Sequence, residues 1–213
     1  MDEKDALRLL RAAGAIVTES HIVYKSGLHG STYVNKDALY PHTREVMRCC
    51  SAIAGWFAGD RVDAVIAPAV GGVILSQWTA FNLTAMAGRE VLSVYAEKDG
   101  DGFAVRRGYD KLVMGKRLLV VEDVLTTGSS VASVIHAVRS LGGYVVGVGA
   151  LCNRGRVTAE SVGDIPRLIA LVNTPLEAWN EDACPLCTRG VPVNTDVGHG
   201  REFLARKTER GLR

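Results

Sequence analysis

The sequence predicts an α/β fold in which a central parallel sheet is covered by helices on both faces. Short apolar runs alternate with segments of helical period between about residues 63 and 172, and parallel strands need such helical crossovers. Polar and acidic residues follow several of these runs, at the strand ends where ligands bind in such sheets. With 213 residues, 47% of them hydrophobic, the chain can bury one full core.

The first 60 residues are less regular than the rest. Apolar residues at helical spacing predict a helix over residues 3–13, which Gly14 ends. Residues 15–24 alternate or run apolar and predict a strand or hairpin, and residues 32–34 predict a short strand. A helix over residues 43–59 follows, and its first threonine is the expected N-cap.

The remaining chain alternates between strands and helices. In chain order we expect a strand at 63–67, a helix at 72–87, strands at 91–96 and 118–122, a helix at 130–141, and strands at 144–152 and 167–172. Residues 98–115 interrupt this order with a polar, glycine-containing stretch. Between buried strands, a stretch of this length is either a functional loop or a solvated hairpin.

The most informative stretch is residues 118–131, where an apolar strand leads into Glu122 and Asp123 and then into a hydroxyl-rich loop and a helix. The N–H groups at a helix N-terminus attract phosphate, and Gly128 allows the backbone a close approach. Two carboxylates beside such a loop are placed to accept hydrogen bonds from sugar hydroxyls. A plain strand, turn and capped helix is the alternative, but it leaves two acids in a buried strand unexplained.

This stretch resembles the phosphoribosyl diphosphate (PRPP) motif of type I phosphoribosyltransferases. The resemblance implies one domain over residues 1–213, with a core of about 43–172 and a small hood mainly from residues 1–40 and the C-terminal region. It also implies catalytic roles for Glu122 and Asp123 at the ribose. PRPP would contact these two acids and the residues that follow them: Val124, Leu125, Thr126, Thr127, Gly128, Ser129 and Ser130.

A second loop follows the strand at 63–67 and contains Ala69, Val70, Gly71 and Gly72. Two glycines at a strand-to-helix turn allow a tight loop with exposed amides, although ordinary turn chemistry is the alternative. The loop resembles the family's pyrophosphate loop, so we expect these four residues to bind PRPP. Some orotate enzymes of the family carry a lysine where this chain has Gly71, so part of the pyrophosphate charge must be met elsewhere.

Two further segments narrow the resemblance to the orotate phosphoribosyltransferase family. The segment with Lys25, Tyr33 and Val34 is similar to the family's N-terminal signature. The resemblance implies that Lys25 contacts PRPP or orotate and that the backbone at the other two positions meets the pyrimidine. Arg154 and Thr126 are the other expected orotate contacts, and an arginine fork suits the substrate carboxylate. A solvated lysine and a surface arginine are the alternatives.

Residues 98–108 are expected to cover the site. In the family, a mobile basic loop reaches across a dimer into the neighbour's active site, and Lys98 matches its first basic position. We therefore expect Lys98 to be catalytic and to bind PRPP. The second lysine and the histidine of some family members are missing, and we expect Arg106 and Arg107 to replace their charge.

The resemblance implies transfer of the 5-phosphoribosyl group from PRPP to orotate, giving orotidine 5′-monophosphate and pyrophosphate. It also implies a homodimer, and a Mg²⁺ ion held mainly by substrate and water instead of protein ligands. Two alternatives stay open: a type I phosphoribosyltransferase for another base, and a PRPP-sensing regulator without turnover. The glycine at position 71 and the missing basic residues of the 98–108 segment are compatible with a regulator that binds PRPP without turnover.

Composition restricts the partners and the compartment. A formal net charge of +2 gives no support for nucleic-acid binding, and no apolar run reaches the ~20 residues that span a bilayer. The charged N-terminal residues do not resemble a signal peptide. Five cysteines without a disulfide framework fit a reducing compartment, so we expect a cytoplasmic protein without membrane or nucleic-acid partners.

Cys184 and Cys187 have the spacing of metal ligands or of a redox pair. A structural zinc ion needs about four ligands, and His199 and Cys152 are the candidates for the other two. Because the sequence holds no second Cys-x-x-Cys pair and no thioredoxin-like context, we expect neither a zinc site nor a redox pair.

Overall fold

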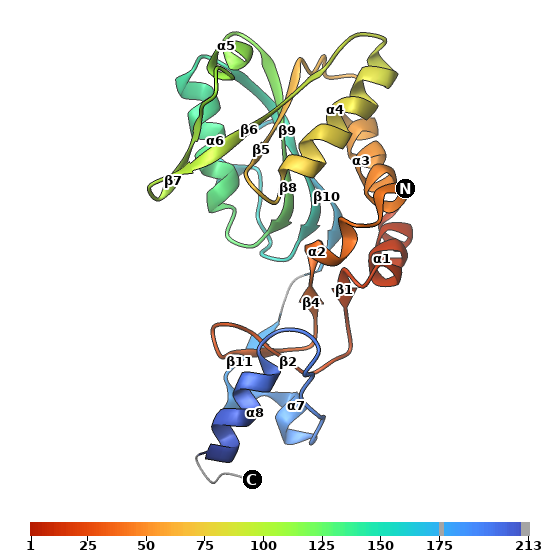
Figure 1. The fold of residues 1–213 in the computed structure, drawn as a ribbon, viewed down its shortest axis with the longest axis vertical. Helices are drawn as coiled ribbons and strands as arrows, with labels where there is room; N and C mark the ends of the chain where they lie inside the picture. Colours follow the sequence, from red (N-terminus) through yellow and green to blue (C-terminus); the bar gives the residue numbers. More distant parts are fainter. Residues whose placement is uncertain (175–176, 210–213) are drawn as a thin grey trace.

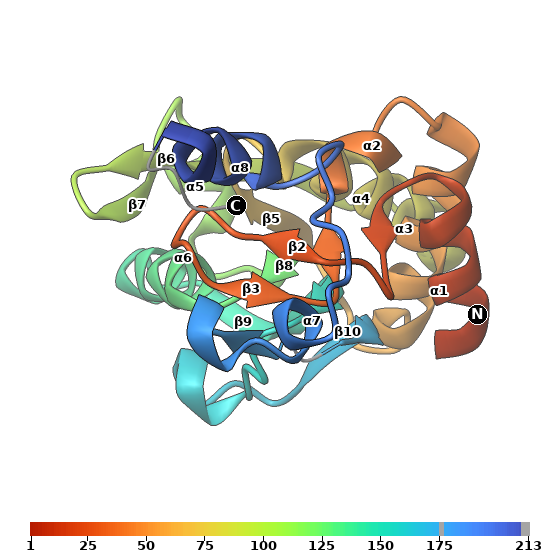
Figure 2. The same ribbon diagram turned by 90° about the horizontal axis from the view of Figure 1, so that it is seen from below.

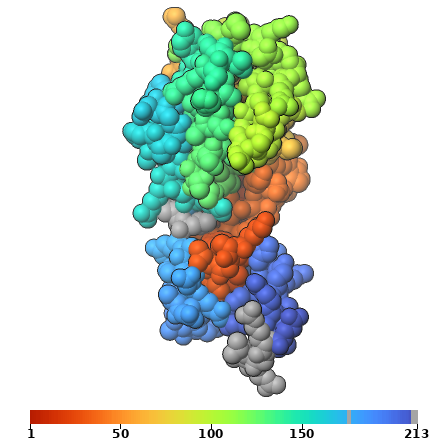
Figure 3. Space-filling model, turned by 90° about the vertical axis from the view of Figure 1, so that its left-hand side faces the viewer, coloured from red at the N-terminus to blue at the C-terminus, as the bar shows by residue number. Residues whose placement is uncertain are grey.

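The computed structural model describes residues 1–174 and 177–209, which form a larger core and, below it in Figure 1, a smaller hood. A pair of short antiparallel strands, β1 (Ile16–Val17) and β4 (Tyr33–Val34), connects the two parts. The space-filling view shows a narrow waist at this level (Figure 3). The hood is therefore joined to the core by little of the described chain.

In the described part of the chain, the core sheet has six strands in the order β10-β9-β8-β5-β6-β7. Neighbouring strands are parallel except for β6 and β7, which form an antiparallel hairpin. This confirms the predicted sheet, whose carboxyl ends point toward the hood (Figure 1). The strands are β5 (Ala64–Pro68), β6 (Leu92–Asp99), β7 (Gly102–Val105), β8 (Arg117–Leu125), β9 (Tyr144–Asn153) and β10 (Leu168–Asn173).

Helices cover both faces of this sheet (Figure 1). Side chains alternate between the faces along each strand, so that Val65 and Leu119 pack on one side while Ile66 and Val120 pack on the other. The first face is covered by α1 (Glu3–Ala12), α3 (Thr43–Phe57) and α4 (Val73–Ala87), and the second by α6 (Ser129–Ser140) and the short α5 (Asp110–Val113).

The hood is built from both ends of the chain (Figure 2). Its small sheet has the order β11-β3-β2, and its strands are antiparallel. The elements are β2 (Ile22–Val23), β3 (His29–Gly30), β11 (Ala178–Trp179), the 3-10 turn η2 (Glu181–Ala183), α7 (Pro185–Thr188) and α8 (Gly200–Glu209). Of the residues expected in the hood, those of α1 pack instead on the core, where Leu9 and Leu10 join the cluster containing Leu171.

Several boundaries differ from the prediction. The strand with the two acids runs on to Leu125, so Glu122 and Asp123 lie inside β8 and not at its end. Residues 98–108 contain a hairpin formed by the end of β6 and by β7, while their expected role as a cover stays a prediction. The helix expected to have a threonine N-cap is instead capped at His42. Helix α2 (Lys36–Leu39) and the turn η1 (Glu160–Val162) are too short to show a period in the sequence.

Among the described helices, none combines the length and the apolar character needed to cross a lipid bilayer.

Candidate active site

The acid pair lies near the carboxyl end of β8, where the sheet meets the waist of the molecule. Glu122 is 8% exposed and Asp123 is 6% exposed. The Asp123 amide donates to Glu122 Oε1 at 3.0 Å, and the Val124 amide donates to Asp123 Oδ1 at 2.7 Å. Backbone amides thus orient both acidic side chains. The second oxygen of each, Oε2 of Glu122 and Oδ2 of Asp123, accepts no hydrogen bond from these two amides.

Lys36 and Tyr40 complete the surroundings of Asp123, and sequence reasoning missed both. Lys36 Nζ lies 2.9 Å from Asp123 Oδ2. The Tyr40 hydroxyl lies 3.2 Å from the same oxygen and donates to the Gly71 carbonyl at 2.7 Å. Lys36 comes three residues after Tyr33, directly behind the segment that resembles the family's N-terminal signature, and this position was the one sequence feature that could have pointed to it. No feature of the sequence pointed to Tyr40.

Burial and charge shift the proton affinities of this group. Burial raises the pKa of Glu122 to about 8, and the neighbouring charge of Asp123 acts in the same direction. For Lys36, burial works to lower the pKa, but the hydrogen bond and charge of Asp123 outweigh it and the pKa is raised. Burial thus favours the protonated form of Glu122, which can donate as well as accept, while the charge of Asp123 favours the protonated form of Lys36.

A small cavity of about 110 Å³ lies between the end of β8 and the start of α6. Gly128 has φ +79°, and a Cβ there would come within 2.8 Å of Val157 and Val162, so this position needs glycine. The Thr127 and Ser129 hydroxyl oxygens are 3.0 Å apart. The cavity is lined by Glu122, Val124, Leu125, Thr126, Thr127, Gly128, Ser129, Ser130 and Val131. Its size, hydroxyls and helix N-terminus suit a phosphate group.

The loop after β5 approaches the acid pair from a neighbouring strand. A Cβ on Gly71 would collide with Lys36 Nζ and Asp123 Oδ2, so the glycine leaves room for this ion pair. The ammonium group of Lys36 thus occupies the space that a side chain at position 71 would enter. Ala69, Val70 and Gly72 form the rest of the loop, with the Val70 side chain 85% exposed.

A larger cleft of about 630 Å³ lies between the hood and the carboxyl ends of β8 and β9. It brings together all five residues expected to contact orotate, although they come from distant parts of the chain. Its lining consists of these five, Lys25, Tyr33, Val34, Thr126 and Arg154, together with Tyr24, Ser26, Leu28, Gly155, Ala178 and His199, which were not predicted.

Arg154 lines this cleft at a point where the segment after β9 contacts the segment at the end of β8. Its Nε donates to Thr126 Oγ1 at 2.9 Å. The amides of Arg154 and Gly155 both donate to the Leu125 carbonyl, at 3.0 and 3.1 Å. A Cβ on Gly155 would overlap the Thr126 carbonyl, so only glycine permits this approach. The guanidinium is anchored through one edge, and the geometry favours carboxylate binding through the other.

Lys98 is not brought to this site within one chain. It lies on the β6–β7 hairpin, with Nζ 5.4 Å from the centre of the Phe103 ring, and it lines neither cavity. Arg106 pairs with Asp99 at 2.8 Å and Arg107 with Glu97 at 2.7 Å. Both arginines thus pair with acids of their own hairpin, and their role in replacing the missing charge of the cover stays a prediction.

The structure also separates the ligands considered for Cys184 and Cys187. His199 lines the cleft, and Cys152 is buried in β9. The side chains beside the two cysteines are instead His21 and His29.

Comparison with known proteins adds independent information. A family model described as "Phosphoribosyl transferase domain" matches residues 35–182. The chain is 40% identical over 190 residues to an orotate phosphoribosyltransferase of Thermus thermophilus, covering 89% of this chain and 98% of the relative. It is 36% identical over 203 residues to the orotate phosphoribosyltransferase of Caulobacter vibrioides, covering 94% and 98%.

Solved structures agree with these matches. The orotate phosphoribosyltransferase of Aeropyrum pernix aligns with a TM-score of 0.60 at 25% identity, over 78% of this chain and 92% of the other. The Mycobacterium tuberculosis enzyme in complex with PRPP aligns with a TM-score of 0.58 at 22% identity, over 81% and 96%. The second comparison supports the fold alone.

Proposed function

This chain belongs to the orotate phosphoribosyltransferase family, and from that premise we propose how its site transfers the 5-phosphoribosyl group of PRPP to orotate. The products are orotidine 5′-monophosphate and pyrophosphate, as pyrimidine biosynthesis requires. One observation carries the proposal: a phosphate-sized cavity, a buried acid pair and a cleft lined by Lys25 and Arg154 adjoin one another at the carboxyl edge of the sheet.

We place the 5′-phosphate in the cavity at residues 126–130, where the N-terminus of α6 and the loop hydroxyls favour an anion. The ribose then lies against Glu122 and Asp123, whose oxygens receive its 2′ and 3′ hydroxyls. During transfer the bond from C1 to pyrophosphate breaks and a bond from C1 to the base nitrogen forms. Positive charge develops on the ring, and the carboxylate of Asp123 stabilises it electrostatically. No general base is needed, because orotate binds in its ionised form.

The pyrophosphate would meet the amides of residues 69–72 and the ammonium group of Lys36. The position of Lys36 supports this role because its charge lies directly beside Gly71. Mg²⁺, which the family uses with PRPP, would neutralise the pyrophosphate charge. The oxygen ligands here are the side chains of Glu122 and Asp123, but the raised pKa of Glu122 disfavours the charged carboxylate that Mg²⁺ prefers, and Lys36 and Tyr40 already engage Asp123 Oδ2. The residues therefore fit an ion held through water and substrate oxygens.

Orotate would lie in the larger cleft. The fork of Arg154 matches the orotate carboxylate, while the backbone at Tyr33 and Val34 meets the pyrimidine edge. Lys25 adds positive charge at the rim, and Thr126 lies between the base and the sugar because it lines both cavities.

We infer a homodimer from the outer face of α4. The helix is largely apolar, and Ile74, Phe81 and Met86 are exposed, at 38%, 61% and 47%, together with the polar Gln77. Exposed apolar side chains on one helix are typical of an interaction surface, so a second copy of the chain is the partner that this face fits. In such a dimer Lys98, which is remote from its own acid pair, serves the partner's site. A cytoplasmic location stays our prediction.

Turnover of competing bases tests the assignment. Enzyme, PRPP and Mg²⁺ are mixed with orotate, uracil or adenine, and loss of each base is followed by chromatography. Orotate should be consumed and the others left unchanged. Consumption of another base would reassign the substrate. Calorimetric binding of PRPP without product from any base would favour the PRPP-sensing regulator, which the isolated position of Lys98 leaves as the second candidate.

A further inference from the structure

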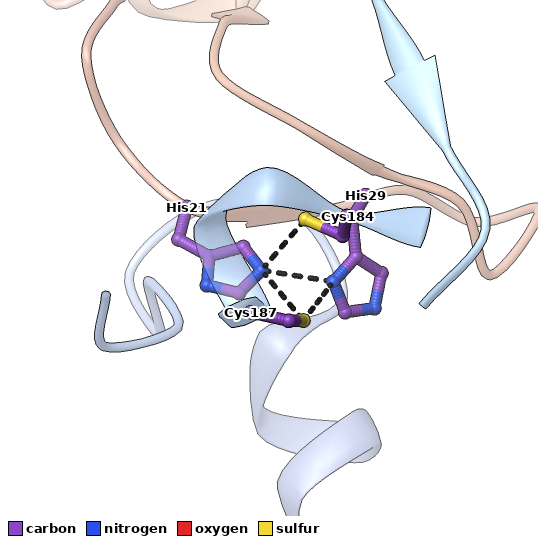
Figure 4. Close-up of side chains that lie close together, drawn as sticks. All are labelled: His21, His29, Cys184 and Cys187. Carbon is purple, nitrogen blue, oxygen red and sulfur yellow. Dashed lines mark hydrogen bonds between the residues drawn. The ribbon is translucent and has the colours of Figure 1, made fainter. Parts of the chain in front are cut away.

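Four side chains of metal-binding types meet inside the hood (Figure 4), and none of them lines the proposed substrate cleft. His21 precedes β2, His29 lies on β3, and Cys184 and Cys187 belong to the segment that forms α7. Three of them are buried, and Cys187 is partly buried. The chain thus brings two N-terminal histidines to two C-terminal cysteines that lie more than 150 residues away in sequence.

The donor atoms converge on one point. His21 Nε2 lies 2.8 Å from His29 Nδ1, 3.7 Å from Cys184 Sγ and 3.6 Å from Cys187 Sγ, and the four donors lie within 4.8 Å of one another. Bonds of about 2.0–2.1 Å to nitrogen and about 2.3 Å to sulfur put tetrahedral zinc ligands roughly 3.3–3.8 Å apart. The observed separations bracket this range, so a small metal ion fits between the atoms after sub-ångström adjustments.

The orientation of the first imidazole suits metal binding. His21 Nδ1 donates to the Val191 carbonyl at 2.7 Å, which leaves Nε2, the atom aimed at the cluster, with a free lone pair. A hydrogen bond from the far ring nitrogen to a carbonyl is the usual support of a metal-bound histidine. His29 Nε2 has no hydrogen-bond partner among the described residues, and its ring meets Phe203 edge-on at 4.9 Å. The polar contacts of His29 are therefore made through Nδ1, which faces His21 Nε2 and Cys187 Sγ.

We propose that His21, His29, Cys184 and Cys187 bind one structural Zn²⁺ ion in a closed tetrahedral site. Two thiolates and two imidazoles are the ligand set that favours zinc over the oxygen-seeking ions Mg²⁺ and Ca²⁺. Four protein ligands fill the coordination shell, so the site has no open position for catalysis. Each thiol releases its proton to solvent when the metal binds. Both cysteines are free thiols in the structure, as this requires.

The ion would crosslink the N-terminal and C-terminal segments of the hood next to the substrate cleft. The strands β2, β3 and β11 are only two residues long, and small units of this kind often gain stability from a bound metal or another crosslink. His21 and His29 flank the turn that carries Lys25 into the cleft. The inferred effect on orotate binding rests on the proposed function, whereas metal binding itself does not.

Metal content tests the proposal without reference to activity. The full chain, purified without an affinity tag, should contain about one zinc per chain by inductively coupled plasma mass spectrometry. Cys184→Ala and Cys187→Ala should lose most of it, while the buried cysteines outside the cluster provide matched controls, since Cys49→Ala and Cys152→Ala should keep it. A wild-type protein that takes up no zinc even after incubation with ZnCl₂ would overturn the site. Equal zinc in all four variants, or iron in place of zinc, would also do so.

Cobalt substitution guards against variants that fail to fold. Wild-type protein loaded with Co²⁺ should show intense visible absorption from a tetrahedral ion and near-ultraviolet bands from thiolate ligation. Absence of the thiolate bands, or a Cys184–Cys187 disulfide in the purified protein, would contradict the assignment. Removal of the metal by a chelator should lower the melting temperature, and it should raise the KM for orotate several-fold if the proposed function also holds.

Discussion

At the scale of single residues, Lys36 is the cation that lies beside the loop of residues 69–72, which we propose as the pyrophosphate site. In the structure, position 71 is a glycine whose missing side chain makes room for the Lys36 ammonium group. The same ammonium neutralises Asp123 at 2.9 Å. One cation thus serves a buried acid in the free protein and is placed to serve the substrate anion during turnover.

Exchanging the lysine between the two positions tests this role. Lys36→Met should reduce kcat/KM for PRPP roughly 100-fold, because one charge facing the pyrophosphate is lost. Gly71→Lys in the Lys36→Met background should recover part of the activity, whereas Gly71→Lys in the wild type should reduce it through the collision with Lys36. The exposed Lys116→Met is the control. Unchanged steady-state kinetics of Lys36→Met would remove this residue from the site.

The raised pKa of Glu122 predicts how stability depends on pH. Its pKa is about 8 when folded, against about 4.3 in an unfolded chain, so the folded protein binds more protons between these values. Stability without ligand should therefore fall as pH rises from about 5 to about 8, by on the order of a few kcal/mol, and level off above that. Glu122→Gln should flatten this dependence in urea unfolding at pH 5, 7 and 9, whereas the exposed-surface control Glu90→Gln should not. A wild-type stability that rises over this interval would refute the assigned protonation.

Arg154 should act on orotate and leave PRPP largely unaffected. Arg154→Ala should raise the KM for orotate roughly 10- to 100-fold, the effect of losing a charge-assisted hydrogen-bond pair, with a much smaller change for PRPP. Steady-state kinetics with each substrate varied in turn measures the split. Arg44→Ala, on the exposed side of α3, should leave both constants unchanged. Equal effects on the two substrates would place Arg154 outside the base pocket.

At the scale of elements, the site is made where β8 and β9 end side by side. These strands are parallel neighbours with Leu125 opposite Asn153, and the segments that follow them lie in contact, since the amides of Arg154 and Gly155 donate to the Leu125 carbonyl. Asn153 supports the second loop, since its side chain exchanges hydrogen bonds with the backbone of Val157 at 2.8 and 3.0 Å. Pairing of the two strands therefore puts the cavity proposed for the 5′-phosphate next to Arg154, the residue proposed to bind orotate.

Gly155 tests this contact. Gly155→Ala places a methyl group against the Thr126 carbonyl, so it should cost about 1–3 kcal/mol of stability and raise the KM for orotate by displacing Arg154. Gly59→Ala, where no atom lies within 4 Å of the added carbon, is the control. Chemical unfolding and orotate kinetics give the two readouts. A Gly155→Ala variant with native stability and native KM would show that the loops do not need this contact.

At the scale of the whole molecule, the chain places Lys98 away from the acid pair of its own site, on a hairpin that projects from the core (Figure 1). The apolar outer face of α4 is the surface that fits a second copy. If both inferences hold, each active site takes residues from two chains.

Mixing two inactive variants tests this sharing. Lys98→Ala and Asp123→Asn should each lose most activity, and an equimolar mixture, dissociated and reassociated, should recover about a quarter of the wild-type rate, because half of the dimers are then mixed and each has one intact site. Mixing Lys98→Ala with Lys98→Met should recover nothing. Phe81→Glu should yield monomers in light scattering and abolish the recovery. Mixed dimers detected by native mass spectrometry without recovered activity would place Lys98 in its own chain's site or outside catalysis.

By itself, the sequence determined the features that depend on neighbouring residues. The alternation of apolar strands and amphipathic helices specified the parallel sheet, and the acid pair followed by the glycine and hydroxyl loop marked the cavity that we propose for phosphate, because each strand, helix or loop signal lies within a short run of consecutive residues. All five residues that the motifs predicted to contact orotate line one cleft in the structure. The motifs did not predict how the fold brings these distant segments together.

Only the tertiary structure decided the pairings between distant segments. The ion pair of Lys36 with Asp123 joins a four-residue helix to a central strand, and the cluster of His21 and His29 with Cys184 and Cys187 joins the two ends of the chain. The spacing of residues along the chain does not predict such contacts, because they form only when separate elements pack on each other. For that reason the sequence suggested His199 and Cys152 as partners of the two cysteines, and the fold brought two other histidines instead.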